Sequence, residues 1–180
     1  MERLTQVSTD VSPSLPRVSL ILGGARSGKS AYAERLIVAA AGGGVYVATA
    51  QARDDEMRAR IAQHRRRRGE GWHTIESPRD ILGPLQSQAR PVLVDCLTLW
   101  LSNLFEAGSD VSRACDELDA CLAQTVGPVV LVANEVGLGI VPDNALARAF
   151  RDAAGRVNQR VAERADQVVF VAAGLPLKLK

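Results

Sequence analysis

The stretch Gly23–Ser30 has the sequence GGARSGKS, and it decides the fold expected of this chain of 180 residues. It matches the phosphate-binding P-loop, G-x-x-x-x-G-K-[ST], directly after an apolar run at 17–22 and directly before a helical pattern at 30–41. Such a loop surrounds a phosphate with backbone N–H groups, while its lysine reaches the terminal phosphates and its last hydroxyl binds Mg²⁺. The expected nucleotide-binding residues are Gly23, Gly24, Ala25, Arg26, Ser27, Gly28, Lys29 and Ser30. The sequence therefore predicts a site for a nucleoside triphosphate.

Short apolar runs alternate with segments of helical period along the rest of the chain. The runs are 17–22, 45–49, 91–95, 129–133 and 167–172, and their composition is typical of strands buried on both faces. The predicted helices are 30–41, 54–67, 81–88, a broken pair within 99–124, and 143–164. This alternation predicts an α/β fold with a mostly parallel sheet and helices on both faces. Trp72, Thr74 and Glu76 are expected to add a short edge strand.

The helix expected at 143–164 has the clearest apolar face. Leu146, Phe150, Val157 and Val161 fall on one stripe along it. Asp143, which follows a proline, is its expected N-cap, because a carboxylate there can accept hydrogen bonds from the first turn. We therefore expect this helix to pack its stripe along the sheet.

Composition predicts a single domain at 17–180 behind a flexible tail at 1–16. Hydrophobic residues make up 47% of the chain and charged residues 23%, within the globular range. A net charge of +2 does not support a nucleic-acid or membrane-surface partner. No segment reaches the roughly 18 apolar residues that a membrane span requires. Three cysteines without ligand spacing favour a cytoplasmic protein over a disulfide framework or a zinc site.

Polar residues end two of the predicted strands. Asp95 ends the third run, and a carboxylate in that position beside a P-loop helps to hold Mg²⁺. Its alternative role is that of a helix cap or turn residue. Asn134 and Glu135 follow the fourth run, where they either face the same crevice or serve only the loop. The sequence thus predicts Ser30 and Asp95 as the metal-binding pair.

A histidine followed by four arginines forms the second candidate site. If 54–67 is helical, Met57, Ile61 and His64 share one face, while Arg58 and Arg65 lie elsewhere. On spacing alone, His64 is a buried side chain bonded to a carbonyl. Beside a phosphate, however, its neutral imidazole is a competent nucleophile, and guanidinium groups would neutralise the phosphate under attack. The arginines concerned are Arg65, Arg66, Arg67 and Arg68.

Two other functions remain open at this point. A run of arginines can also contact nucleic acid, but that use expects aromatic side chains for base stacking, and aromatic residues make up only 4% of the chain. Acidic residues close to the run, including Asp54, Asp55, Glu56 and Glu70, further weaken this interpretation. The nearer alternative is a P-loop kinase for another small molecule, with a structural His64.

Three stretches together resemble one family. They are GGARSGKS at 23–30, the DDEM segment that ends at His64, and ANEVGLGIVPDNALARAFRDAAGRVNQRVAERAD at 133–166. The chain resembles, from about Arg17 to Lys180, the bifunctional adenosylcobinamide kinase and adenosylcobinamide-phosphate guanylyltransferase family of cobalamin biosynthesis. The third stretch is the most specific, because P-loops occur in proteins of many functions.

The resemblance implies two reactions. ATP or GTP phosphorylates the aminopropanol hydroxyl of adenosylcobinamide, and GTP then guanylylates that phosphate through a covalent GMP-histidine, matched here by His64. It further implies a catalytic role for Lys29, Mg²⁺ as cofactor, a homotrimer and a RecA-like sheet. Beyond the P-loop, the matching nucleotide-binding positions are Ala48, Thr49, Ala50, Arg65, Arg66, Arg67, Arg68, Glu76 and Asp95.

Overall fold

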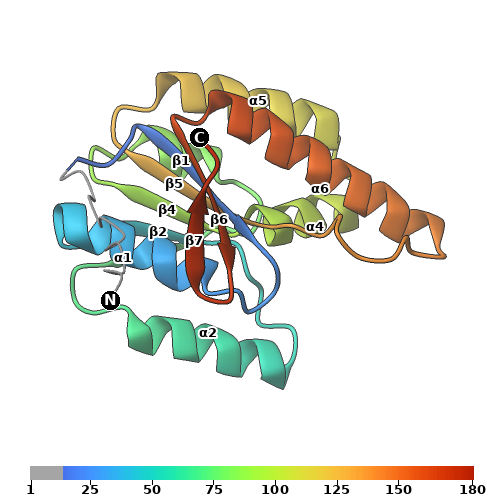
Figure 1. Ribbon diagram of the computed structural model, residues 1–180, viewed down its shortest axis with the longest axis horizontal. Coiled ribbons are helices and arrows are strands. Elements are labelled where there is room, and N and C mark those ends of the chain that lie inside the picture. Colours follow the sequence, from blue (N-terminus) through green and yellow to red (C-terminus); the bar gives the residue numbers. More distant parts are fainter. Residues whose placement is uncertain (1–13) are drawn as a thin grey trace, which may run out of the picture.

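A seven-stranded sheet forms the centre of the molecule, in the order β3-β2-β4-β5-β1-β6-β7 (Figure 1). The computed structural model describes residues 14–180, so most of the expected tail lies outside the described residues. The strands are β1 (Val18–Gly23), β2 (Val45–Ala48), β3 (His73–Glu76), β4 (Val92–Asp95), β5 (Val129–Asn134), β6 (Gln167–Ala172) and β7 (Leu175–Lys178). Each pairing is parallel except that of β6 with β7. The predicted mostly parallel sheet, including the edge strand β3, is confirmed.

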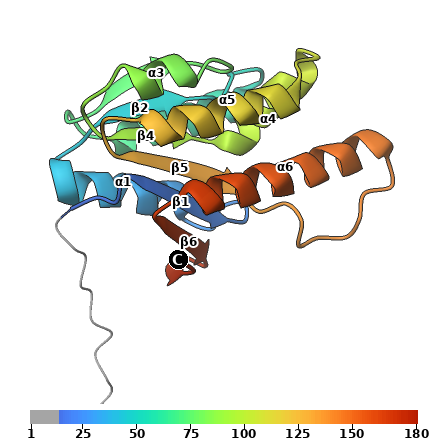
Figure 2. The same ribbon diagram turned by 90° about the horizontal axis from the view of Figure 1, so that it is seen from above.

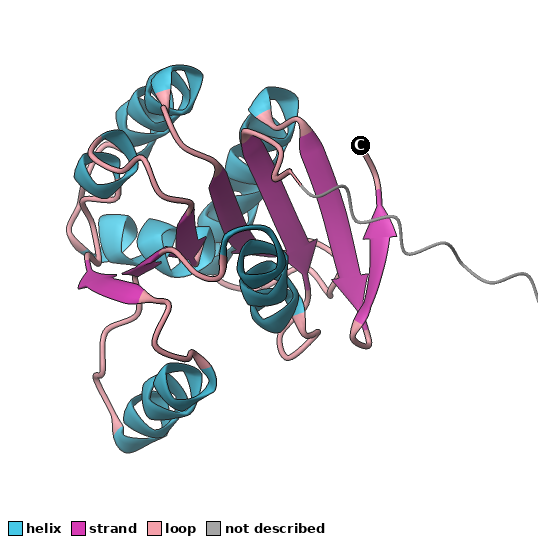
Figure 3. Ribbon diagram, turned by 90° about the vertical axis from the view of Figure 1, so that its left-hand side faces the viewer, coloured by secondary structure: helices cyan, strands magenta, loops and turns pink. Residues whose placement is uncertain are grey.

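Helices cover both faces of this sheet. They are α1 (Lys29–Ala41), α2 (Asp55–Arg67), α3 (Leu82–Gln86), α4 (Leu97–Glu106), α5 (Val111–Gln124) and α6 (Ala145–Arg164). In Figure 1, α1 lies below the sheet, α5 and α6 lie above it, and α4 lies to its right. Figure 3 shows α2 standing away from the sheet, on the side of β2 and β3. None of the helices in the described part of the chain is long and apolar enough to cross a membrane.

Alternating side chains of the strands supply two separate apolar cores. Leu20 of β1 packs with Trp100 and Leu118 on the face covered by α4 and α5. Its neighbour Ile21 points to the opposite face, where it packs with Ile37 of α1. Because both faces are covered, every residue of β1 is buried, as expected for a central parallel strand. The sheet is thus a rigid support for the loops at its carboxyl edge.

The start of α6 differs from the prediction. Asn144, not Asp143, is the N-cap, and its side chain accepts a hydrogen bond of 2.7 Å from the Ala147 N–H. Leu146 is 70% exposed and does not belong to the buried stripe, although Phe150 and Val157 do contact the core. Figure 2 shows that the first turns of α6 extend beyond the sheet, which agrees with the exposure of Leu146.

Strand β7 was not predicted. It pairs antiparallel with β6 after the turn at Ala173 and Gly174, and all four of its residues are exposed. Its leucines at 175 and 177 do alternate, but Pro176 between them and the short length of the run weaken the strand pattern. The predicted helix at 81–88 is also shorter in the structure, where α3 spans only Leu82–Gln86.

The sheet order brings the predicted site residues to one edge. Strand β5 lies between β1 and β4, with Asn134 paired to Gly23 and Val132 paired to Asp95. On the other side of β4, Asp95 pairs with Ala48 at the end of β2. Since parallel strands end at the same edge, the P-loop, Asp95 and Asn134 meet where α/β sheets bind ligands.

Candidate active site

The turn between β6 and β7 contacts the P-loop and holds it in place. The Gly174 N–H donates a hydrogen bond of 2.8 Å to the Ser27 carbonyl. A Cβ at Gly23 would lie 2.4 Å from the Val171 carbonyl oxygen, so only glycine fits at this close approach. Lys29 is buried, and its ammonium donates to the Gly24 carbonyl at 3.0 Å. The loop therefore wraps around the position where phosphates bind in such loops.

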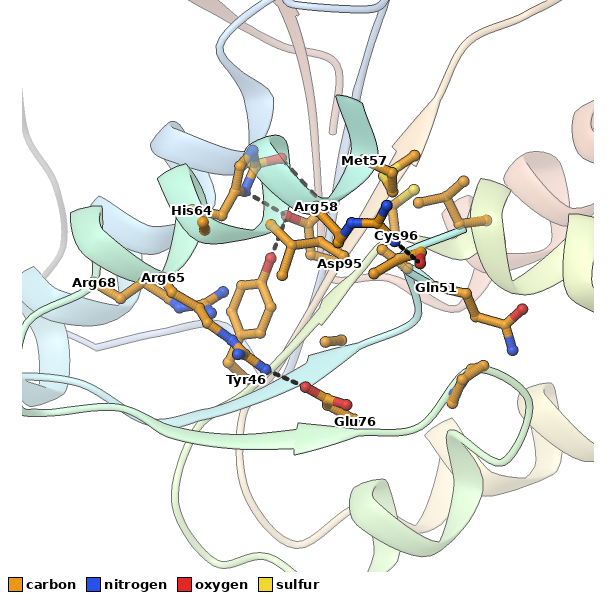
Figure 4. Close-up of a pocket in the computed structure, with 18 of the residues that line it drawn as sticks. Tyr46, Gln51, Met57, Arg58, His64, Arg65, Arg68, Glu76, Asp95 and Cys96 are labelled. Atoms are coloured by element: carbon orange, nitrogen blue, oxygen red, sulfur yellow. Dashed lines mark hydrogen bonds and ion pairs between the residues drawn. The ribbon is translucent and has the colours of Figure 1, made fainter. Parts of the chain in front are cut away.

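Asp95 connects the P-loop to residues from two other elements (Figure 4). Its Oδ1 accepts a hydrogen bond of 3.3 Å from the Ser30 hydroxyl. Its Oδ2 accepts one of 2.7 Å from the Tyr46 hydroxyl of β2. The Nδ1 atom of His64 lies 3.7 Å from the same Oδ2 atom. The imidazole therefore lies beside the predicted metal carboxylate, not across the sheet from it.

Helix α2 presents His64 to a cavity instead of a core. Asp54 caps the helix by accepting a hydrogen bond of 2.7 Å from the Met57 N–H. The face that carries Met57, Ile61 and His64 lines a cavity of about 710 Å³ at the edge of the sheet, here called the sheet-edge cavity. The predicted shared face is thus confirmed. Arg58 and Arg65 were expected elsewhere, yet their side chains also line this cavity.

A second cavity adjoins the first on the P-loop side. This P-loop cavity, of about 630 Å³, is lined by residues of the loop itself and by Glu56, Gln63 and Arg66 of α2. Lys29, Ser30 and His64 line both cavities. Since His64 borders both spaces, ligands in either one could reach its imidazole.

The arginines after His64 have different surroundings. Arg65 forms an ion pair with Glu76 of β3, and both side chains line the sheet-edge cavity (Figure 4). The Arg68 guanidinium lies 3.4 Å from the centre of the Tyr46 ring, a cation–π contact. Nη1 of Arg68 is buried and has no hydrogen-bond partner among the described residues. Arg66 faces the P-loop cavity instead, and the side chain of Arg67 lies outside the described part of the structure.

The turn after β2 contributes to the site in two ways. Ala48 and Ala50 line the sheet-edge cavity. Thr49 lies between them but is fully buried and lines neither cavity; its hydroxyl donates to the Cys96 carbonyl at 2.9 Å. Thr49 therefore fixes the turn beside the strand that carries Asp95. Of the three predicted nucleotide-binding residues in this turn, only the two alanines line a cavity.

Tyr46 is the residue that the sequence interpretation missed. Burial, and next the negative charge of Asp95, raise the pKa of the Tyr46 hydroxyl, which therefore stays protonated and remains a donor. Burial likewise raises the pKa of the neighbouring Cys96 thiol to about 11, so Cys96 is not a nucleophile near neutral pH. One sequence feature could have identified Tyr46: it is the one tyrosine in an otherwise apolar strand, and a buried tyrosine hydroxyl needs a hydrogen-bond partner.

Tyr46→Phe is expected to slow the nucleotidyl transfer that the resemblance implies at His64, while leaving the fold intact. The change removes the hydrogen bond to Asp95 Oδ2 but keeps the ring beneath Arg68. We expect the rate of nucleotidyl transfer to fall about tenfold, because Asp95 loses one of the contacts that orient it. Rapid-quench kinetics with labelled GTP measures this rate. Tyr32→Phe, which changes the only other tyrosine, is the matched control, and equal rates in both variants would contradict the role of Tyr46.

The donor set fits Mg²⁺ in the presence of a nucleotide. Ser30 and Asp95 offer two adjacent oxygen atoms beside the P-loop, and Mg²⁺ binds through one or two protein oxygens plus phosphates and water. Within residues 14–180, no cluster of three or more His, Cys, Asp or Glu side chains could hold a metal by itself. The arrangement therefore suits a metal that arrives with a triphosphate.

The fold and these residues define a P-loop nucleotide-binding protein with a histidine beside the phosphate site. Residues 19–179 match the family described as cobinamide kinase / cobinamide phosphate guanyltransferase, and the chain belongs to this family. The predicted resemblance is thereby confirmed.

Two relatives and one solved structure illustrate the similarity. The chain is 50% identical to the bifunctional adenosylcobalamin biosynthesis protein CobP of Pseudomonas aeruginosa, over 89% of this chain and 96% of that protein. It is 44% identical to the bifunctional adenosylcobalamin biosynthesis protein CobU of Salmonella typhimurium, over 89% and 98%. In fold it is similar to the flagellar accessory protein FlaH of Methanocaldococcus jannaschii, with a TM-score of 0.53, 13% identity, and 93% and 80% of the two chains covered. This last similarity concerns the fold alone, which agrees with the expected RecA-like sheet.

Proposed function

We propose that this chain phosphorylates adenosylcobinamide with ATP or GTP and then transfers GMP from GTP to the new phosphate. The single observation that carries this proposal is the contact network of Asp95. This carboxylate touches the P-loop through Ser30 and lies 3.7 Å from His64, so a triphosphate site and a nucleophile share one carboxylate. A structural histidine would not need to border two cavities.

The P-loop serves both reactions in this proposal. Backbone N–H groups of residues 23–30 and the Lys29 ammonium bind the triphosphate, and Ser30 and Asp95 would hold Mg²⁺ beside it. The metal would supply positive charge to the phosphate oxygens. In the kinase reaction, the aminopropanol hydroxyl attacks the γ-phosphorus, and the bond from that phosphorus to the β-phosphate oxygen breaks. A nucleoside diphosphate leaves.

His64 is the nucleophile of the second reaction. Nδ1 of His64 lies 3.7 Å from Asp95 Oδ2, and in this proposal the imidazole attacks the α-phosphorus of GTP through its other ring nitrogen, Nε2. A nitrogen–phosphorus bond forms, and the bond from the α-phosphorus to the β-phosphate oxygen breaks, which releases pyrophosphate. An oxygen of the cobinamide phosphate then attacks the same phosphorus, and the bond to nitrogen breaks. His64 is regenerated, and adenosylcobinamide-GDP is the product.

The sheet-edge cavity is the proposed site of the guanosine part during this transfer. Its polar lining includes Arg65, Arg68 and Glu76, while Met57, Ile61 and Leu99 supply apolar surface for a base. Arg68 also offers a buried N–H without a hydrogen-bond partner among the described residues, which suits a phosphate oxygen. These contacts support the nucleotide-binding role of the residues after His64.

The remaining expectations belong to the same proposal. We infer a homotrimer that acts in the cytoplasm and uses its arginines for nucleotides instead of nucleic acid. The three cysteines are free, which suits a reducing compartment. Several of the arginines already have partners in the site, such as Glu76 and the Tyr46 ring. Light scattering tests the trimer, and the salt dependence of binding to DNA tests the nucleic-acid alternative.

The proposal is tested with the wild-type protein, GTP labelled at the α-phosphate, and Mg²⁺. We expect a covalent adduct that is labile in acid, as phosphorus–nitrogen bonds to histidine are, and that maps to the peptide containing His64. Chelation of the metal should prevent its formation. GTP labelled at the γ-phosphate is the control and should leave no label on the peptide. If kinase turnover occurs without any adduct, the chain is a small-molecule kinase and the transferase half of the proposal is wrong.

A further inference from the structure

Asn134 lies in the site without a role in the proposed chemistry. It ends β5, is paired with Gly23 of the P-loop, and lines the sheet-edge cavity together with Lys29 and Asp95. Its side-chain Oδ1 is buried, and none of the described side chains or backbone groups donates a hydrogen bond to it. A buried acceptor without a partner is unfavourable for folding, and such groups gather at binding sites.

The backbone of Asn134 is fixed from two sides. Its N–H donates to the Thr98 hydroxyl at 2.7 Å, and its carbonyl accepts from Nδ2 of Asn158 at 3.3 Å. Asn158 is itself buried on α6. The side chain of Asn134 is therefore held at the cavity wall by its main chain, and removal of its amide would leave these two contacts intact.

The chemistry of the free atom restricts its ligand. A carboxamide oxygen can only accept hydrogen bonds, and the oxygens of an ionised phosphate can also only accept them, so the two cannot pair. The triphosphate thus offers no partner to Oδ1. The natural partner is a hydroxyl group close to the phosphate that is transferred, and the nucleophile of the kinase reaction is such a hydroxyl.

An exposed apolar loop begins immediately after Asn134. Leu138 is 82% exposed, Ile140 98% and Val141 58%, while Leu146 at the start of α6 is 70% exposed. Figure 2 shows this segment, between β5 and α6, extending beyond the sheet. So many large apolar side chains on one short exposed segment indicate a surface that binds a partner.

The loop is held by its own hydrogen bonds. The Gly137 N–H donates to the Glu135 carboxylate at 2.5 Å. Arg148 donates to the carbonyls of Pro142 and Asp143 at 3.0 and 2.6 Å. These hydrogen bonds fix the two ends of the loop, on either side of Leu138, Ile140 and Val141.

We propose that Asn134 and the loop residues Leu138, Ile140 and Val141 form the subsite for the corrinoid acceptor. The inference rests on the proposed function, because it assigns the corrinoid to this surface. Asn134 Oδ1 accepts the aminopropanol hydroxyl inside the cavity. The macrocycle, which is too large for the nucleotide cavities and is tethered to that hydroxyl, lies outside and packs its apolar face on the loop.

The hydroxyl oxygen, oriented by Asn134, forms a bond to the γ-phosphorus as the bond to the β-phosphate oxygen breaks. The hydroxyl proton passes to an oxygen of the transferred phosphoryl group and then to water. Asn134 orients the nucleophile and takes no proton. Formation of the GMP adduct on His64 does not involve this hydroxyl, so the subsite acts only where the corrinoid takes part.

Asn134→Ala and the double variant Leu138→Ser/Ile140→Ser test the two parts of the subsite. For Asn134→Ala we expect the kinase kcat to fall about 100-fold, because an unoriented hydroxyl attacks poorly. For the double variant we expect the Kd of adenosylcobinamide to rise about tenfold, measured by equilibrium dialysis with the corrin absorbance. The rate of GMP labelling at His64 should stay within about threefold of wild type in the double loop variant, whose residues line neither cavity.

Matched controls separate this inference from its rivals. Gln167→Ala removes another buried acceptor that lines neither cavity, and Leu175→Ser/Leu177→Ser alters exposed leucines on β7. Neither control should change kcat or Kd.

An unchanged kcat in Asn134→Ala, or an unchanged Kd in the loop variant, overturns the proposed subsite. Dissociation of the loop variant into monomers also overturns it, since the loop would then be a subunit contact. Wild-type protein that binds the corrinoid without phosphorylating it contradicts the proposed function alone.

Discussion

Lys29→Ala is expected to reduce both the kinase and the guanylyltransferase rates by about 10²- to 10³-fold, as expected for the loss of a group that stabilises charge at a transferred phosphate. The ammonium of Lys29 lies inside the P-loop, where it donates to the Gly24 carbonyl, and it lines both cavities. Under the proposed function both reactions place a triphosphate in this loop, so one substitution should impair both. Steady-state kinetics with each substrate pair measures the two losses.

Two further variants sharpen this expectation. Lys178→Ala changes an exposed lysine on β7 and should leave both rates unchanged. Lys29→Arg keeps the charge but replaces a compact ammonium with a larger, planar guanidinium group. This variant should not restore activity, because the P-loop surrounds the ammonium closely. A normal rate of either reaction in Lys29→Ala would show that the two reactions do not share one phosphate site.

The sequence was most informative where a local pattern is tied to one structure. The apolar runs predicted all five central strands, and the glycine and lysine spacing predicted the P-loop, because those patterns depend only on neighbouring residues. The capping residue of α6 was wrong by one position, since Asp143 and Asn144 are both good caps and only the backbone geometry decides between them. Strand β7 was missed because Pro176 interrupts its four residues, although Leu175 and Leu177 alternate with the period of a strand.

Sequence patterns could not predict contacts between elements that are distant along the chain. The hydrogen bond from Tyr46 to Asp95 joins two strands whose adjacency follows from the sheet order. The placement of His64 near Asp95 depends on the distance between α2 and the sheet, and helical periodicity gives no information about that distance. Spacing alone favoured a buried structural histidine, and only the resemblance to a family indicated the nucleophile.

The position of α2 also explains how one phosphate site can serve two reactions. Its inner face borders the sheet-edge cavity, while Glu56, Gln63 and Arg66 face the P-loop cavity. A nucleotide can therefore lie on either side of His64 with its phosphates still near Lys29. Under the proposed function, the change from phosphoryl to guanylyl transfer requires a different placement of the nucleoside and no second P-loop.

His64→Ala is expected to abolish guanylyl transfer, with a loss of at least about 10⁴-fold, because no other described side chain combines a nucleophilic nitrogen with the Asp95 contact. The kinase rate should stay within about threefold of wild type, since that reaction uses the corrinoid hydroxyl as nucleophile. Alanine is a good helix former, so α2 should remain folded. Labelling with α-phosphate-labelled GTP and a coupled kinase assay give the two rates.

The second histidine provides the matched control for this variant. His73 lies exposed on β3 and lines neither cavity, so His73→Ala should label normally. Free imidazole added to His64→Ala should restore part of the transfer, because it can occupy the space left by the side chain and attack the α-phosphorus in its place. Label that persists on His64→Ala without imidazole would place the nucleophile elsewhere. Equal loss of the kinase rate would instead show that His64 supports the phosphate site as a whole, since a nucleophile for GMP alone has no part in the first reaction.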